Sequence, residues 1–381
     1  MASMTITNAR AVMGGKIQSC NIRLADGKIQ GLLPPGDTYG KTYDAKNKLV
    51  APGFIDVHTH GAAGVDFNHA DAKDVRTVRD FFAAQGVTTF LPTVVADTEE
   101  TMLRSIMAVG RAKTELLCPQ IYGVHLEGPF LNPQNKGAIA EKMLRAPDYN
   151  LFRRLQAASG GLIRRVTLAP ELSGSTELIG RLRGEGISVS LGHCSATYEQ
   201  TMAAVEAGAH SATHLFNAMA PLEHHQPGVI GAAFASDIYC EAICDGKHLH
   251  PGTVCMIFAA KGTRRTVAVT DSMSAAGLGD GLYKLGVHDV VVKGLDAKLL
   301  GDGTRAGSVL TMPAALKNLM AFTQRPLEEV LPCLTETPAR MMGIFNQKGS
   351  IDVGKDGDLV VLDRDCHVAA TFSCGVLMYQ A

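Results

Sequence analysis

The chain has 381 residues, 46% of them hydrophobic, and its 36 Lys and Arg nearly balance its 37 Asp and Glu. That length supports one large domain or two ordinary ones, each with its own core. The formal net charge of -1 leaves no excess positive charge to hold a polyanion, and no block of Lys and Arg supplies one locally. The sequence therefore disfavours a nucleic-acid-binding protein.

Signals for membranes, secretion and disulfides are weak. No stretch approaches the ~20 uninterrupted apolar residues of a membrane span, and the first ten residues lack the basic start and apolar run of a secretory signal. The nine Cys form no C-x-x-C pair, and an odd number cannot all pair within one chain. We therefore expect a soluble cytoplasmic protein, without membrane partners, in which most thiols are free.

In chain order, short alternating runs at 3–8, 20–24 and 28–32 predict antiparallel strands of a small sheet. The pattern changes at Pro52-Gly53, after which strands alternate with helices whose apolar residues return every three or four positions. The predicted strands are 53–58, 87–94, 119–126, 164–169, 187–192, 209–213, 240–244 and 265–270. The predicted helices are 72–85, 99–114, 141–158, 175–184, 197–207, 251–261 and 311–323.

Eight strand and helix units over about 270 residues predict an α/β fold, a (β/α)8 TIM-type barrel. A doubly wound sheet is the alternative, because counting strands does not reveal closure. The chain returns to strand character at 358–363 and 367–379, so both ends can share one small β-sandwich domain. We predict that this discontinuous domain comprises 1–51 and 345–381, and that the catalytic barrel comprises 52–344.

Histidines and acidic residues stand where several predicted strands end, which is the face where barrels build active sites. His58 and His60 alternate along a strand, so both side chains point into the barrel interior, where unpaired polar groups are costly. A lone His of this kind is usually a hydrogen-bonded core residue. The H-x-H pair together with Glu127, His193 and His214 favours a divalent metal site instead.

Imidazole nitrogen and carboxylate oxygen, with no Cys at these positions, suit Zn²⁺, Fe²⁺, Co²⁺ or Mn²⁺. Asp271 closes the last predicted strand, where a carboxylate can take a proton from a water molecule and deliver it to a leaving amine. Its alternative interpretation is an N-cap for the following turn.

These residues resemble the amidohydrolase superfamily and, within it, the N-acetylglucosamine-6-phosphate deacetylase family, over nearly the whole chain. The H-x-H strand and the closing Asp indicate the superfamily alone. The narrower resemblance rests on Pro52-Gly-Phe-Ile-Asp-Val-His-Thr-His-Gly61, His125-Leu-Glu-Gly-Pro-Phe130, Leu191-Gly-His193, Thr213-His-Leu-Phe-Asn-Ala-Met219, Asp245-Gly-Lys-His248, Val269-Thr-Asp271 and Ala306-Gly-Ser308.

The resemblance implies a role for each matched position. Glu127, His193 and His214 would hold the principal metal, His58 and His60 could add a second, and Asp271 would be the general base and acid. His248 would contact the substrate near the reacting group. The remaining substrate contacts implied are Asn217 and Ala218 at the phosphate, and Ala138, Arg305, Ala306 and Gly307 in the sugar pocket. A plain turn before the helix at Thr311 is nearly as good an interpretation of 305–308.

Two departures from the family pattern concern the substrate. The family usually has Lys-Gly-Ala-His where this chain has Lys136-Gly-Ala-Ile139, so Ile139 stands at a substrate-binding position. It also usually has Arg-Glu-Pro-Gly, whose Arg reaches the phosphate across a dimer interface, where this chain has His225-Gln-Pro-Gly228. A His with a pKa of about 6.5 replaces the permanent charge of Arg only in part. Arg305 could supply the missing charge, or His225 could be a plain surface residue.

The leading hypothesis is therefore metal-dependent hydrolysis of the acetamide of an N-acetylated amino sugar 6-phosphate by a homodimer with one or two metals per subunit. A related amidohydrolase without a 6-phosphate requirement is the alternative, for example another N-acyl sugar hydrolase, a D-aminoacylase or a nucleobase deaminase. A cyclic-amide hydrolase is disfavoured, because the strand over 164–169 leads into Ala-Pro-Glu without a bridging Lys. A non-catalytic sugar-binding relative would be expected to have lost a ligand or the base, and this chain keeps both.

Overall fold

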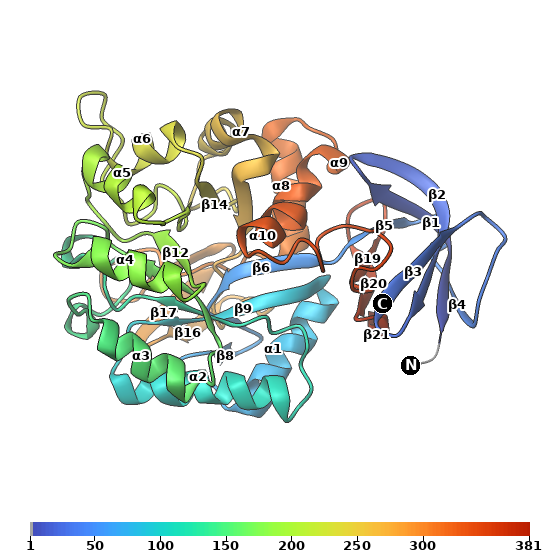
Figure 1. The fold of residues 1–381 in the computed structure, drawn as a ribbon, viewed down its shortest axis with the longest axis horizontal. Helices are drawn as coiled ribbons and strands as arrows, with labels where there is room; N and C mark the ends of the chain where they lie inside the picture. Colours follow the sequence, from blue (N-terminus) through green and yellow to red (C-terminus); the bar gives the residue numbers. More distant parts are fainter. Residues whose placement is uncertain (1–2) are drawn as a thin grey trace.

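The computed structural model describes residues 3–381 and contains a barrel of eight parallel strands (Figure 1). Their order in the sheet follows the chain without a reversal, so the doubly wound alternative is wrong and the barrel is confirmed. The first and last strands meet where Asp271 N donates to His58 O at 2.9 Å and His60 N to Ser272 O at 2.7 Å. The strands are β6 (Phe54–Thr59), β9 (Val87–Val95), β10 (Val124–Glu127), β11 (Ile163–Leu168), β12 (Ser188–Leu191), β13 (Ser211–Ala212), β14 (Tyr239–Ile243) and β15 (Thr266–Val269).

Helices surround the barrel and bury one face each against it (Figure 1). Side-chain caps fix where several begin: Asp71 accepts from Asp74 N at 2.9 Å, and Thr197 accepts from Gln200 N at 3.2 Å. These helices are α1 (Ala72–Ala84), α2 (Glu99–Thr114), α3 (Tyr149–Ala158), α4 (Ser175–Gly184), α5 (Tyr198–Glu206), α6 (Gly228–Ala235), α7 (Pro251–Arg265) and α8 (Met312–Thr323), followed by the short α9 (Leu327–Val330) and α10 (Glu336–Met341).

The predicted helix over 141–158 is wrong in its first half. A single 3-10 turn, η2 (Glu141–Met143), precedes an extended segment, and α3 begins only after Asp148. Pro147 explains the break, because the residue before a proline is pushed out of the helical region. The side chain of Asp148 then caps α3 by accepting from Asn150 N at 2.8 Å.

The two chain ends form one eight-stranded sheet beside the barrel (Figure 1). Three strands, β19, β5 and β1, separate β4 from β20, yet the rings of Tyr43 and Phe372 lie 5.1 Å apart. Since neighbouring strands are about 4.8 Å apart, this sheet must fold over on itself, which gives the expected sandwich from one continuous sheet. Its strands are β1 (Met4–Met13), β2 (Lys16–Ala25), β3 (Lys28–Leu33), β4 (Lys41–Asp44), β5 (Leu49–Pro52), β19 (Leu359–Leu362), β20 (Val368–Ser373) and β21 (Val376–Gln380). The domain boundaries at 51/52 and 344/345 stay a prediction.

A small antiparallel sheet that the sequence did not predict follows the last barrel strand. It consists of β16 (Gly281–Leu285), β17 (His288–Lys293) and β18 (Asp296–Leu299). Gly286 and Gly294, with φ of 54° and 58°, make its two turns. Its inner face packs on Met273 and Ala306, so the sheet covers one side of the barrel mouth. No helix within residues 3–381 combines the length and the apolar character needed to cross a membrane.

Candidate active site

Glu127, His193 and His214 meet at the carboxyl ends of β10, β12 and β13. Glu127 Oε1 lies 3.1 Å from His193 Nε2 and 3.0 Å from His214 Nε2, and the two Nε2 atoms are 3.2 Å apart. All three side chains are buried. The structure therefore brings together three residues that the sequence predicted as one group.

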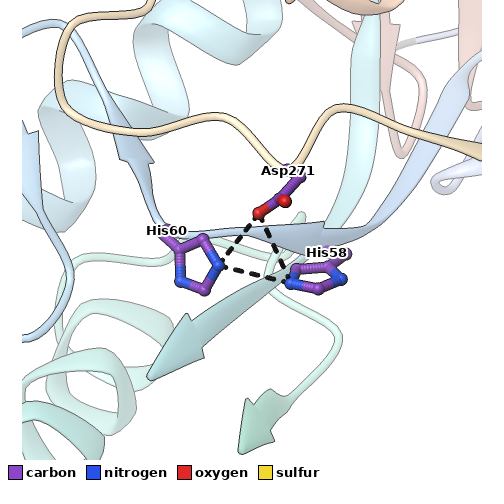
Figure 2. Close-up of side chains that lie close together, drawn as sticks. All are labelled: His58, His60 and Asp271. Carbon is purple, nitrogen blue, oxygen red and sulfur yellow. Dashed lines mark hydrogen bonds and ion pairs between the residues drawn. The ribbon is translucent and has the colours of Figure 1, made fainter. Parts of the chain in front are cut away.

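Figure 2 shows a second triad, His58, His60 and Asp271. His60 Nε2 is 3.0 Å from Asp271 Oδ1 and 3.3 Å from His58 Nε2. His58 lies on β6, His60 follows that strand directly, and Asp271 follows β15. The alternation of the H-x-H pair thus brings both rings to the same point inside the barrel.

Glu127 joins the two triads, because its Oε2 atom is 3.2 Å from His60 Nε2 while its Oε1 atom faces the first triad. The converging atoms are imidazole nitrogens and carboxylate oxygens, the ligand set of Zn²⁺ and related transition metals. Two Nε2 atoms directed at one carboxylate oxygen fit a shared cation. The donor set therefore fits a divalent metal at one triad or at both.

The charges of the site favour such a cation. Burial lowers the pKa of His60, but hydrogen bonds to Asp271 and Glu127 outweigh it and raise this pKa to about 9. Burial raises the pKa of Asp271, but the charge of His58 and the contact with His60 outweigh it and lower this pKa to about 2. The buried carboxylates of Asp271 and Glu127 thus favour protonated imidazoles beside them. A divalent cation can replace these protons, because it brings positive charge to the same carboxylates and binds deprotonated imidazole.

The backbone at three strand ends adopts an unusual conformation. His193, His214 and Asp271 have φ of 50°, 30° and 49°, in the left-handed region that costs non-glycine residues roughly 1–3 kcal/mol each. Phe216 and Ala218 continue the pattern with φ of 78° and 49°. In the segment 214–218 the backbone N–H groups of Leu215 and Asn217 donate to Glu241 O at 3.0 Å and to His214 O at 2.9 Å. This strained segment carries Asn217 and Ala218.

A cavity of about 290 Å³ opens above the triads. Several residues predicted to bind substrate line it: Ala138, Ile139, Asn217, Ala218, His248, Arg305 and Gly307. Two others do not. Ala306 is fully buried behind the cavity wall, and His225 lies in an exposed group with Glu223 and His224. The cavity also has lining residues that sequence reasoning missed, including Leu285 and Thr304, which the unpredicted sheet and its return loop bring to the mouth.

His248 enters the cavity from the loop after β14 and is held by Asp245. His248 Nδ1 lies 2.6 Å from Asp245 Oδ2, and Asp245 Oδ1 accepts from the backbone N–H groups of Lys247 and His248 at 2.7 and 2.8 Å. The carboxylate fixes the loop and the ring together. The other ring nitrogen, Nε2, is left for a ligand.

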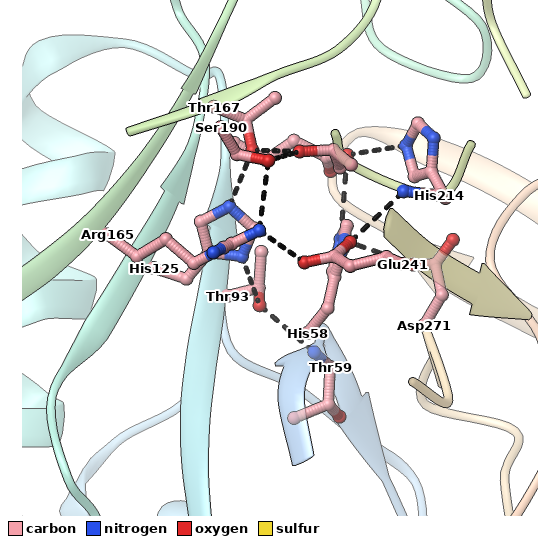
Figure 3. Close-up of polar contacts among 12 residues, drawn as sticks. His58, Thr59, Thr93, His125, Arg165, Thr167, Ser190, His214, Glu241 and Asp271 are labelled. Carbon is pink, nitrogen blue, oxygen red and sulfur yellow. Dashed lines mark hydrogen bonds and ion pairs between the residues drawn. The ribbon is translucent and has the colours of Figure 1, made fainter. Parts of the chain in front are cut away.

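Beneath the triads lies a polar layer that the sequence analysis did not identify (Figure 3). His125, which shares a motif with Glu127, is not part of either triad: its Nε2 lies 2.7 Å from Thr167 Oγ1. Arg165 and Glu241 form an ion pair with no exposed side-chain area. The sequence does carry one signal for this ion pair, which is a charged residue within each of the predicted strands 164–169 and 240–244.

Comparisons with known proteins agree with this geometry. The Amidohydrolase family matches residues 49–378. The N-acetylglucosamine-6-phosphate deacetylase of Bacillus subtilis is 38% identical over 371 residues, covering 95% of this chain and 93% of that protein. The human deacetylase of the same name is 36% identical over 397 residues, covering 99% and 96%.

Solved structures give the same result. The crystal structure of N-acetylglucosamine-6-phosphate deacetylase from Pasteurella multocida superposes with a TM-score of 0.94 at 30% identity, over all of both chains. A mutant of the Mycobacterium smegmatis deacetylase, in complex with N-acetyl-D-glucosamine-6-phosphate, superposes with a TM-score of 0.93 at 31% identity, again over all of both chains. This chain belongs to the amidohydrolase superfamily and, within it, to the N-acetylglucosamine-6-phosphate deacetylase family.

Proposed function

We propose that this protein hydrolyses the acetamide of N-acetylglucosamine 6-phosphate to acetate and glucosamine 6-phosphate. The observation that carries the proposal is the convergence of two buried His/carboxylate triads on the floor of one cavity, in a chain of this family. The bond cleaved is a linear amide. A second candidate, an N-acyl substrate without a 6-phosphate, is not favoured, because the solved structure of a relative holds N-acetyl-D-glucosamine-6-phosphate.

The proposed metal ligands are Glu127, His193 and His214, with His58 and His60 available for a second ion. Zinc is the proposed metal, and Fe, Co and Mn suit the same nitrogen and oxygen ligands. When bound, such an ion polarises the acetyl carbonyl and lowers the pKa of water.

Asp271 is the proposed general base and acid. Its Oδ1 atom faces the triads, and its lowered pKa leaves the carboxylate ionised. In the proposed reaction Asp271 takes a proton from the attacking water and returns it to the amine nitrogen when the C–N bond breaks. His248 donates from Nδ1 to Asp245, so it would donate from Nε2 to the carbonyl oxygen as an imidazolium with both nitrogens protonated, where negative charge develops.

The proposed sugar phosphate contacts lie along the cavity wall. Asn217 and Ala218, which line the cavity, would contact the phosphate. Arg305 lines the cavity, and its Nε atom is 3.3 Å from Asp296 Oδ1, so its positive charge is partly neutralised. Ala138, Ile139 and Gly307 would shape the sugar pocket. We further propose a cytoplasmic homodimer, in which His225 of one subunit would approach the phosphate of the other.

A substrate panel tests this proposal. The zinc-loaded protein would be assayed for acetate release from N-acetylglucosamine 6-phosphate, its galacto epimer, the 6-sulfate and the unphosphorylated sugar. We expect the highest kcat/KM for the 6-phosphate of the gluco sugar. Equal kcat/KM for the phosphorylated and unphosphorylated sugars would favour the second candidate.

A further inference from the structure

Glu241 contacts both triads from beneath the active site (Figure 3). It lies on β14, and its partner Arg165 lies on β11, two strands that face each other only through the barrel interior. Both side chains have no exposed area. A buried carboxylate or guanidinium is strongly disfavoured unless it is paired, so this pair has to be satisfied where it stands.

The guanidinium of Arg165 is held by more than its carboxylate partner. Its Nη2 atom donates to Glu241 Oε1 and to Ser190 Oγ at 2.9 Å, and its Nη1 atom donates to Ser188 Oγ at 3.2 Å. These bonds fix the guanidinium from one side of the barrel. Oxygen Oε1 of Glu241 is therefore occupied, and the carboxylate cannot rotate without breaking the ion pair.

The second oxygen of Glu241 serves the two triads. Glu241 Oε2 lies 3.0 Å from His58 Nδ1 and accepts from His214 N at 3.1 Å, where the backbone has φ of 30°. A carboxylate is only an acceptor, so the contact with His58 requires the proton on Nδ1. With Nδ1 engaged by Glu241, Nε2 is the ring nitrogen that faces His60, Glu127 and Asp271.

The other histidines lack a comparable carboxylate. Among residues 3–381, no protein group hydrogen-bonds to the buried Nδ1 atoms of His60 and His214, and His193 Nδ1 lies 2.9 Å from Asn135 O. A metal-binding imidazole depends on the hydrogen bond of its other nitrogen to fix its tautomer and orientation. His58 thus has the most constrained ring of the four.

We propose that Glu241 is a positioning residue that fixes His58 in the Nδ1–H tautomer, with Nε2 free to bind metal, and that Arg165 locks Glu241 in this role. This inference rests on the proposed function, since it needs His58 to be a metal ligand. It adds a residue that touches neither the substrate nor the metal. It also links the two triads through one side chain.

Histidine NMR tests the tautomer of His58 in the wild-type protein, and a variant is needed only to assign the resonances. Zinc-loaded protein labelled with ¹⁵N-histidine would be compared with His58→Asn to assign the resonances of His58. We expect the proton of His58 on Nδ1. A proton on Nε2 would overturn the proposal.

Zinc affinity, measured by competition with a chromophoric chelator, tests the positioning. In Glu241→Gln the side-chain amide has one acceptor oxygen, which can face Arg165 or His58 but not both. When this oxygen faces Arg165, the NH₂ group faces His58 Nδ1 and disfavours a proton there. We expect zinc affinity to fall about 10- to 100-fold, as for other residues that orient metal ligands. The matched control Ser188→Ala removes one bond of Arg165 without touching His58, and we expect it to keep the wild-type affinity.

The double variant Arg165→Met/Glu241→Leu separates folding from positioning. It removes the guanidinium together with its carboxylate partner, so it should fold even where Glu241→Gln does not, and because it leaves no acceptor for His58 Nδ1 it should show the same weakened zinc affinity. Wild-type affinity in the double variant, beside weakened affinity in His58→Asn, would overturn the inference alone. Wild-type affinity in His58→Asn would instead reject His58 as a ligand, and with it this part of the proposed function.

Discussion

Oε2 of Glu127 lies 3.2 Å from Nε2 of His60, so the carboxylate of one triad contacts the other. We therefore expect Glu127→Ala to lose metal from both triads. Elemental analysis of the purified variant measures this loss. Glu223→Ala, which removes a carboxylate from the exposed His224/His225 group, is the matched control and should keep its metal. Wild-type metal content in Glu127→Ala would contradict the assignment.

Asp271→Asn tests the proton transfer. An amide cannot accept and return the proton, so kcat should fall about 10²- to 10⁴-fold while the melting temperature stays near that of the wild type. Asp280→Asn changes an exposed acid whose Oδ1 accepts from Gly294 N outside the cavity, and it should keep the wild-type rate. A loss of less than a few-fold in Asp271→Asn would return this residue to a turn-capping role.

Arg305→Ala tests phosphate recognition. Because only the phosphorylated substrate carries the anion, KM should rise about tenfold for it and stay unchanged for the unphosphorylated sugar. Steady-state kinetics on both sugars give the comparison. His225→Ala should produce the same split only if that residue reaches the phosphate of a partner subunit. If neither variant separates the two substrates, the 6-phosphate is not recognised by these residues.

Lys348 stabilises the junction between the barrel and the sheet formed by the chain ends. It lies 2.7 Å from Asp356 and also pairs with the buried Asp358, and the charges of these acids outweigh burial and raise the pKa of Lys348. Lys348→Met leaves Asp358 without its cation, so the free energy of unfolding should fall by about 3 kcal/mol in urea denaturation. Lys28→Met removes the more exposed partner of Asp356 and should cost less than about 1 kcal/mol. Equal effects would contradict this account.

The pH dependence of stability has a source outside the active site. His210 lies between Met341 O at 3.1 Å and Val189 O at 3.2 Å, and its burial lowers its pKa to about 4. The unfolded chain, with a usual pKa of about 6.5, binds this proton first, so stability is fully present above pH 6.5 and is lost as the pH falls toward 4.

The loss should reach at most about 3 kcal/mol in the free energy of unfolding. Denaturation of the wild type and of His210→Gln at pH 7, 6, 5 and 4 would isolate this contribution. The difference between the two proteins should narrow as the pH falls. A constant difference across this range would show that His210 does not titrate on unfolding.

The barrel and both triads could be predicted because their signals are local. Alternating strands and helices give the fold, and His58 and His60 share a face by the period of a strand. Asp271 and Glu127 stand at strand ends, which a barrel brings together.

Other features depend on contacts between distant segments. Arg165 and Glu241 pair across the barrel, which no local period encodes. The short strands of the sheet β16–β18 are separated by glycine turns, and the position of this sheet places Leu285 in the cavity wall. His225 has an exposed position in this subunit, and an assembly contact cannot be read from one chain.

The central claim is that this protein hydrolyses N-acetylglucosamine 6-phosphate with the metal ligands and the base named above. Reaction of the zinc-loaded protein in H₂¹⁸O, followed by mass spectrometry of the products, tests it most directly. We predict acetate that carries one ¹⁸O atom, formed in equal amount with glucosamine 6-phosphate, and lost when a chelator removes the zinc. The absence of acetate from the zinc-loaded protein, or acetate without ¹⁸O, would contradict the claim.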